Sequence, residues 1–171
     1  DDLNSEFIKD VILEKTKRHD IIGITSLTNT FYLAKQIAEL IKKSNREKIV
    51  VLGGPHVSFQ YHEILKIEPT IDFICVGESE TSFLELVNLI IRNKNELMSS
   101  QAFEKKLDAI RGLAYRNLEG KVRFTGVPKP IDIETIPIPT RYLLSQKNFY
   151  YRVASVIINR GCPNACSFCS R

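Results

Sequence analysis

Three short apolar runs recur along the first half of the chain, and each ends in a loop of small residues. They lie at residues 20–26 (DIIGITS), 48–56 (KIVVLGGPH) and 71–80 (IDFICVGESE). None alternates polar with apolar residues, so both faces of each predicted strand should be buried. Strands of this kind, separated by helices, are typical of a parallel sheet with helices on both faces. The predicted fold class is therefore α/β, with a Rossmann-like (flavodoxin-like) sheet.

Amphipathic segments separate the three runs. Apolar residues recur at helical spacing in residues 5–19, after a cap at Asn4 or Ser5, and again in residues 61–67 and 81–93. In residues 30–43, one face of the predicted helix carries Phe31, Ala34, Ile37, Ala38 and Ile41.

The loops after the three runs have the sequences TSLTNT, GGPHVS and GESE. In open parallel sheets, ligands bind outside the carboxyl ends of the strands, where such loops meet. The sequence therefore predicts a ligand site at this edge. A GxGxxG motif is absent from the sequence, which disfavours a dinucleotide.

A different pattern follows residue 109. Residues 110–126 predict a β-hairpin in which Gly120 has a positive φ. Residues 128–152 contain four of the seven prolines and predict an extended connector. Residues 153–171 begin with another apolar run, ASVIINRG. We therefore divide the chain into a domain at 1–127, the connector, and the start of a second domain at 153–171.

Three cysteines close the chain with the spacing CxxxCxxC: Cys162, Cys166 and Cys169. Thiolates at this spacing can converge on one metal centre. Structural zinc prefers four closed ligands, and no fourth cysteine or suitable histidine lies nearby in the sequence. A cubane iron–sulfur cluster with one open iron matches three thiolates better. Four cysteines in 171 residues are also too few for a disulfide scaffold, and they favour a reducing, cytoplasmic setting.

The run RGCPNACSFCS resembles the CxxxCxΦC signature of radical S-adenosylmethionine enzymes, with Phe168 at the aromatic position. The resemblance implies that the three cysteines hold a [4Fe-4S] cluster whose open iron chelates S-adenosylmethionine. It also implies that Phe168 lies near the adenine, and that reduction by an external electron donor yields a 5′-deoxyadenosyl radical. The run ASVIINRG would then be the first strand of the family's β/α barrel.

The preceding residues are similar to the cobalamin-binding domain found in one branch of this family, which includes anaerobic cyclases and cobalamin-dependent methyltransferases. The matching stretches are DIIGITSLT, VVLGGPHVS, FICVGESE, GLAYRN and IPIPTRYLL. Cobalamin needs a flat surface at the strand ends and a groove for its nucleotide tail, which backbone can approach closely at glycine. The expected cofactor contacts are Thr25, Ser26, Leu27, Thr28, Gly53, Gly54, Pro55, His56, Val57, Gly77 and Glu78.

No histidine ligand to cobalt is expected, because none of the three histidines has the frame of the Asp-x-His-x-x-Gly motif of other cobalamin domains. His56 could equally line the pocket or cap its loop. Cys75 is expected in the core. Glu78 and Glu80 are expected to stabilise a helix N-terminus rather than to act as acid and base.

We expect the chain to be a fragment of a larger enzyme. It begins with Asp1, Met98 is its single methionine, and the similar domains have an earlier strand, helix and strand. Because most of a barrel would lie beyond Arg171, the fragment itself should be inactive. No stretch reaches the roughly 18 apolar residues that span a bilayer, and a net charge of +4 does not indicate nucleic acid.

The function these features favour is radical methyl transfer or ring closure at an unactivated carbon of a small-molecule substrate. The alternative is a radical enzyme whose front domain recognises substrate without binding cobalamin. A methylthiotransferase is disfavoured because Cys75 is the only cysteine of the front domain. A binding module with a zinc knuckle is disfavoured by the three-thiol spacing.

Overall fold

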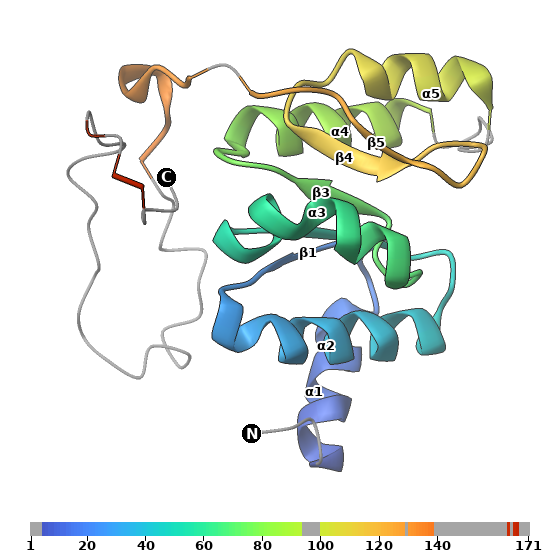
Figure 1. The fold of residues 1–171 in the computed structure, drawn as a ribbon. Helices are drawn as coiled ribbons and strands as arrows, with labels where there is room; N and C mark the ends of the chain where they lie inside the picture. The colour runs from blue at the N-terminus through green and yellow to red at the C-terminus, as the bar shows by residue number, and fades with distance from the viewer. Residues whose placement is uncertain (1–4, 94–99, 129, 139–163, 165, 168–171) are drawn as a thin grey trace. The chain divides into compact units, whose positions relative to one another are not determined.

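The computed structural model describes residues 5–93, 100–128, 130–138, 164 and 166–167. The chain divides into two compact units, Asp1–Ile131 and Asp132–Arg171. The elements are α1 (Glu6–Thr16), β1 (Ile21–Thr25), a 3-10 turn (Thr28–Thr30), α2 (Phe31–Ser44), β2 (Ile49–Gly53), α3 (Pro55–Ile67), β3 (Phe73–Cys75), α4 (Glu80–Arg92), α5 (Gln101–Asp108), β4 (Leu113–Arg116), β5 (Val122–Phe124) and a second 3-10 turn (Ile133–Thr135) (Figure 1).

The strands form one sheet in the order β1-β2-β3-β4-β5. The pairs β1–β2 and β2–β3 are parallel, whereas β4 runs antiparallel to β3 and to β5. The register places Thr25 beside Gly53, so the carboxyl ends of the first two strands lie level. The predicted α/β class and the predicted hairpin are confirmed, with Gly120 at φ 76°. The hairpin also extends the parallel sheet, which the sequence pattern did not reveal.

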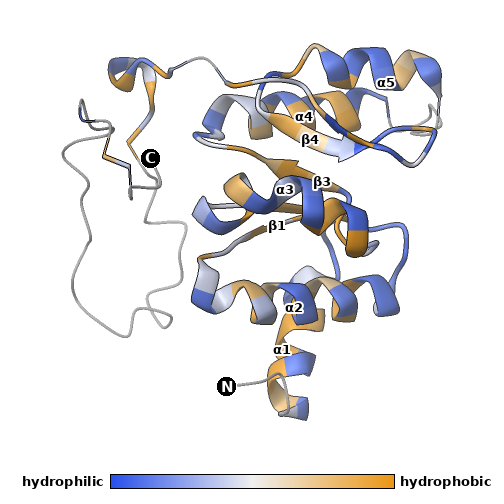
Figure 2. Cartoon of the chain, in the orientation of Figure 1, coloured by the Kyte–Doolittle hydropathy of each residue, from blue (hydrophilic) through white to orange (hydrophobic). Residues whose placement is uncertain are grey.

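Helices cover both faces of the sheet, as predicted. On one face, alternate strand residues such as Val50, Leu52 and Ile74 pack against α2 and α3. On the other face, Val51 and Cys75 are among the strand residues that pack against α4 and α5. Figure 2 shows the strands as mainly apolar and the helices as divided between apolar and polar residues. This pattern is the reason the central strands lack polar alternation.

Two helices differ from the sequence prediction. The loop predicted after β2 is the first turn of α3, because Gly54 is the N-cap residue and Pro55 occupies the first helical position. Proline suits that position, since its missing N–H would have no partner there. Helix α5 was not predicted. Its Ser100 accepts a hydrogen bond from the Phe103 N–H at 3.1 Å, which is a typical N-cap contact.

Two basic side chains close helix ends from distant points in the sequence. The Lys48 ammonium donates to the carbonyls of Thr16 and His19 at 2.9 and 2.7 Å, at the end of α1. The Arg116 guanidinium donates to the carbonyls of Leu65 and Ile71 at and beyond the end of α3. Both contacts satisfy carbonyls that have no partner within a helix.

Strand β1 is more exposed than β2. Gly23 and Thr25 are exposed, whereas Ile49–Leu52 are buried. Within the described residues, β1 pairs only with β2 and forms the edge of the sheet. None of the described helices combines the length and apolar character that crossing a bilayer would require. The predicted strand at 153–160 and most of the connector lie outside the described residues.

Candidate functional site

The loops after β1 and β2 touch at the carboxyl edge of the sheet. The Ser26 N–H donates to the Gly53 carbonyl at 2.9 Å, one residue beyond the strand ladder. Gly54 follows with φ 106°, a conformation that L side chains rarely adopt. A Cβ at Gly54 would lie 2.5 Å from the Ser26 carbonyl oxygen. Glycine is therefore required here for conformation and for space.

Helix α3 connects this contact to the loop after β3. The Ser58 hydroxyl donates to the Gly54 carbonyl at 2.9 Å and accepts from the Gly77 N–H at 2.9 Å. Gly77 itself has φ 77°, and Pro128 packs against it. One hydroxyl thus joins two loops, and the three predicted loops meet at one edge of the sheet.

A cavity of about 300 Å³ opens between the ends of these strands and α4. Its walls include Gly23 and Thr25 of β1, Val51 and Gly53 of β2, Cys75 of β3, and Phe83 of α4. Ligand pockets in proteins typically measure about 300–1,000 Å³. This cavity is therefore large enough for a small planar group or for one end of a larger ligand.

The Ser26 hydroxyl is the unusual polar group at this edge. The residue is 1% exposed, and its Oγ has no hydrogen-bond partner among the described residues. A buried polar group without a partner costs about 1–3 kcal/mol. Ser26 directly follows the lining residue Thr25 but does not itself line the cavity. Its hydroxyl is a hydrogen-bonding group that the described residues leave unused.

Cys75 is buried in the core, as predicted, and it also lines the cavity. Burial raises the pKa of its thiol to about 11, and a hydrogen bond with Ser82 opposes that shift. The thiol is therefore neutral at ordinary pH. It offers the cavity a weakly polar surface and no thiolate.

The raised pKa makes stability depend on pH. The unfolded thiol ionises near pH 9 and the folded thiol near 11, so stability that is present below pH 9 is lost as pH rises to 11. At 1.36 kcal/mol per pKa unit, the loss is about 2–3 kcal/mol. We expect urea unfolding to show that the stability advantage of wild type over Cys75→Ala shrinks by this amount between pH 8 and 11. If the free energies of unfolding of the two proteins changed in parallel with pH, this prediction would be contradicted.

His56 is held on the outer side of the site. Its Nδ1 shares a 3.2 Å hydrogen bond with the Thr28 hydroxyl, and its ring packs against Phe31 with centroids 4.6 Å apart. These contacts connect the start of α3 to the start of α2. His56 is not among the residues that line the cavity. Its observed contacts match the alternative in which it stabilises the loop rather than lines the pocket.

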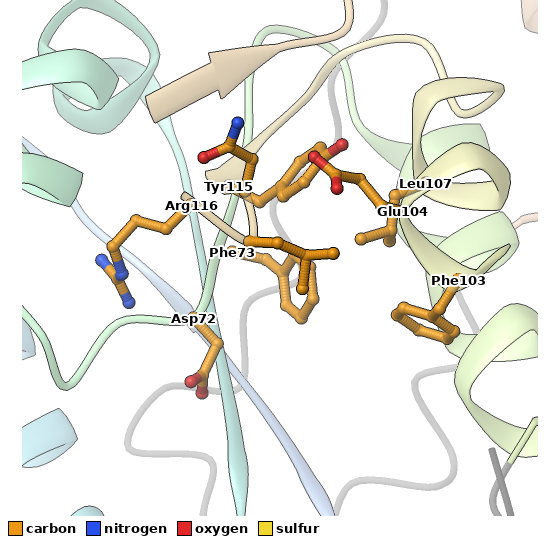
Figure 3. Close-up of a pocket in the computed structure, with 9 residues that line it drawn as sticks. Asp72, Phe73, Phe103, Glu104, Leu107, Tyr115 and Arg116 are labelled. Carbon is orange, nitrogen blue, oxygen red and sulfur yellow. The ribbon is translucent and has the colours of Figure 1, made fainter. Parts of the chain in front are cut away.

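A second cavity, of about 230 Å³, lies near the other end of β3. Figure 3 shows the rings of Phe73, Phe103 and Tyr115 around it. Several of its polar groups already serve the fold. The Tyr115 hydroxyl donates to Asp108 at 2.8 Å, and burial raises the pKa of this phenol. Because Arg116 is bound to helix carbonyls, this cavity offers fewer polar groups to a ligand.

Comparison with known proteins identifies the family. Residues 1–87 match the family described as the B12 binding domain. The chain belongs to the B12-binding domain family.

Three relatives of this B12-binding domain chain are informative. It is 34% identical to the anaerobic magnesium-protoporphyrin IX monomethyl ester cyclase of Rubrivivax gelatinosus, over 100% of this chain and 31% of the cyclase. It is 32% identical to the bacteriochlorophyllide d C-8(2)-methyltransferase of Chlorobaculum tepidum, over 88% and 28% of the two chains. It is 24% identical to the cobalamin-dependent radical SAM methyltransferase TokK of Streptomyces tokunonensis, over 88% and 22%. The chain thus spans less than a third of each of these relatives.

The residues at the strand ends fit B12. The unpartnered Ser26 hydroxyl suits a cofactor rich in amides. The space at Gly53, where an added Cβ would have no neighbour nearer than 4.0 Å, lets a ligand approach the strand backbone. The cavity is too small for the whole cofactor but suits one end of it. The predicted contacts Thr25, Gly53 and Gly54 line this cavity.

The other predicted site residues fall into three groups. Leu27, Thr28, Pro55, Gly77 and Glu78 are exposed around the same edge. Val57 is buried in the core and does not line the cavity. Cys166 is exposed, whereas Cys162, Phe168 and Cys169 lie outside the described residues.

Sequence reasoning missed Ser79, the N-cap residue of α4, and Phe83 within that helix, which also line the cavity. The buried positions of α4 are Ser82, Leu86 and Ile90. Phe83 lies next to that stripe, and a glycine in the middle of β1 leaves room for its ring. A large residue at the edge of an apolar face, opposite a strand glycine, is the signal that could have found it.

Proposed function

We propose that this chain is the cobalamin-binding part of a radical S-adenosylmethionine enzyme that performs methyl transfer or ring closure at an unactivated carbon. The cavity at the strand ends carries the proposal, because the predicted contacts Thr25, Gly53 and Gly54 line it in a chain of the B12-binding family. The orphaned Ser26 hydroxyl, one residue beyond Thr25, supports it. The relatives that are named as cyclases and methyltransferases support the reaction class.

Different strand-end residues would contact different parts of the cofactor. Thr25 would supply a hydroxyl from the cavity wall, and Ser26 would supply the buried hydroxyl one residue further along the chain. The open space at Gly53 would let the nucleotide tail approach the backbone. The exposed loops around Leu27 and Glu78 would contact the corrin. No histidine on cobalt is proposed, because none of the three histidines has the frame of the Asp-x-His-x-x-Gly motif.

The second half of the proposal rests on the sequence motif. Cys162, Cys166 and Cys169 would hold a [4Fe-4S] cluster, with Phe168 beside the adenine of S-adenosylmethionine. Together the cofactors supply a methyl carrier and a radical that abstracts hydrogen. The proposal includes a small-molecule substrate, an external electron donor and a cytoplasmic location, in keeping with the oxygen-sensitive cluster.

An anaerobic absorbance spectrum tests both halves. The chain, purified with cobalamin and reconstituted with iron and sulfide, is expected to retain one corrin per chain and about four iron atoms. Replacing Cys162, Cys166 and Cys169 with alanine should remove the iron and leave the corrin bands. Iron without corrin in the wild-type chain would contradict cobalamin binding and favour a front domain that recognises substrate.

The Ser26 hydroxyl permits a prediction with opposite signs for stability and binding. Ser26→Ala removes an orphaned buried hydroxyl, so the cofactor-free chain should gain about 1 kcal/mol in its free energy of unfolding. The same variant should bind cobalamin more weakly. Urea unfolding and a spectrophotometric cobalamin titration measure the two effects.

Ser58→Ala is the matched control, because the Ser58 hydroxyl makes two hydrogen bonds and both partners are backbone groups of the protein. That variant should lose about 1–2 kcal/mol of stability. If Ser26→Ala destabilised the chain as much as Ser58→Ala, the Ser26 hydroxyl would have a partner after all.

A further inference from the structure

The chain leaves the sheet at the same edge as the loop after β3. Strand β4 runs antiparallel to β3 and β5 runs antiparallel to β4, so the carboxyl ends of β3 and β5 point the same way. Backbone hydrogen bonds continue beyond the strand ladder. The Val76 N–H donates to the Gly112 carbonyl at 2.8 Å, and the Gly112 N–H donates to the Gly126 carbonyl at 2.8 Å. These bonds bring the residues after β5 next to the loop after β3.

Pro128 packs into a socket formed by two glycines, Gly77 in the loop after β3 and Gly112 just before β4. A Cβ at Gly112 would lie 3.0 Å from Pro128 Cβ, and a Cβ at Gly77 would lie 3.3 Å from Pro128 Cγ. Optimal contact between carbon atoms is about 3.5–4.0 Å, so a side chain at either glycine would crowd the proline. Both glycines also have positive φ, 77° and 81°, which disfavours any L side chain there.

A proline is well suited to fill this socket. Its ring fixes φ and has almost no rotamer freedom, so packing it costs little side-chain entropy. Pro128 is half-buried and follows shortly after the end of β5. The contact therefore holds the start of the connector against the loop after β3, with no flexible side chain between them.

The loop after β3 carries two predicted cofactor contacts, Gly77 and Glu78, and both residues are exposed. Two contacts hold Gly77. Its N–H donates to the Ser58 hydroxyl at 2.9 Å, and the Pro128 ring packs against it. Exposed loops open at a low free energy compared with the core of a sheet. Removing one of the two contacts should therefore loosen the loop without unfolding the sheet.

We propose that Pro128 is a positioning residue that holds the loop after β3 in the conformation that binds cobalamin. This inference rests on the proposed function and deepens it. The same contact holds the start of the connector, so cobalamin binding and the packing of Pro128 stabilise each other. Such coupling is reciprocal: if the packed proline raises the affinity for cobalamin, bound cobalamin must in turn stabilise the packed proline.

Pro128→Ala tests the contact with Gly77. Alanine keeps the Cβ that faces Gly112 and removes the Cγ and Cδ atoms that face Gly77. We expect a spectrophotometric titration to show that hydroxocobalamin binds about fivefold more weakly or worse, as is typical of coupled sites. The circular dichroism spectrum and the urea midpoint should change little.

Pro130→Ala is the matched control for the loss of a proline. Pro130 is exposed in the same connector, and its atoms are not among the nearest neighbours of either socket glycine. This variant should bind hydroxocobalamin as tightly as wild type does.

Hydrogen exchange measured by mass spectrometry tests the coupling itself. A peptide containing Gly126 and Val127 reports on the segment that leads into Pro128. In wild type, cobalamin should slow exchange both in this peptide and in the loop after β3. In Pro128→Ala, cobalamin should no longer slow exchange in the peptide. A merely structural proline would not make the protection of this segment depend on cobalamin. The wild-type measurement needs no variant, so it decides the question even if Pro128→Ala is unstable.

Equal cobalamin affinity in wild type and Pro128→Ala, or an equal loss in Pro130→Ala, would overturn the role of Pro128 while leaving cobalamin binding intact. Exchange in the wild-type peptide that cobalamin does not change would overturn it as well. If the folded wild-type chain did not bind cobalamin, the proposed function would fail, and this inference with it. Weaker binding in Pro128→Ala alone, with cobalamin-dependent protection only in wild type, would support the assigned role.

Discussion

Gly54→Ala should lower the free energy of unfolding by about 2–5 kcal/mol and abolish cobalamin binding. Two costs add at this position. An L residue at φ 106° costs about 1–2 kcal/mol, and a Cβ 2.5 Å from the Ser26 carbonyl oxygen forces the two loops apart, at about 1–3 kcal/mol. Urea unfolding measures the loss of stability, and a spectrophotometric titration measures the loss of binding.

Gly120→Ala separates the two costs. Gly120 also has a positive φ, 76°, but a Cβ there would meet nothing within 4 Å. This variant should lose only about 1–2 kcal/mol and bind cobalamin normally. Equal losses in the two variants would mean that the contact between the loops after β1 and β2 adds no constraint.

Arg116→Leu should destabilise the chain by about 3 kcal/mol. The Arg116 guanidinium donates to the carbonyls of Leu65, Glu68 and Ile71, and burial lowers its pKa. Hydrogen bonds to charged groups contribute about 1.5–3 kcal/mol, and the freed carbonyls would lose their partner. Thermal and urea unfolding monitored by circular dichroism would measure the effect.

Arg92→Leu provides the control for the charge change. Arg92 is exposed in the last turn of α4, so its replacement should change stability by less than about 0.5 kcal/mol. A loss in Arg116→Leu no larger than in Arg92→Leu would show that β4 does not stabilise the end of α3 through this side chain.

Much of the fold could be predicted because it follows from local periodicity. The apolar face of α2 was identified correctly, since Ala34, Ala38 and Ile41 are buried. The unbroken apolar runs predicted parallel strands, and the loops after them predicted the edge at which Thr25, Gly53 and Gly54 line a cavity. Helix α5 was not predicted, because most of its residues are polar. Its two buried side chains, Phe103 and Leu107, form too short an apolar pattern to indicate a helix.

The linear pattern of residues was enough to establish the parallel strands, the glycine-rich edge and the thiol motif, because each depends on neighbours a few positions apart. Packing alone decided that β4 pairs with β3 and that Phe83 lies beside Gly23. It also decided that Lys48, just before β2, and Arg116 of β4 bind carbonyls at the ends of distant helices. The contact between Phe83 and Gly23 joins residues 60 positions apart in the numbering. Contacts of this kind depend on how elements stack, and side-chain size and direction set them only once the sheet and helices have come together.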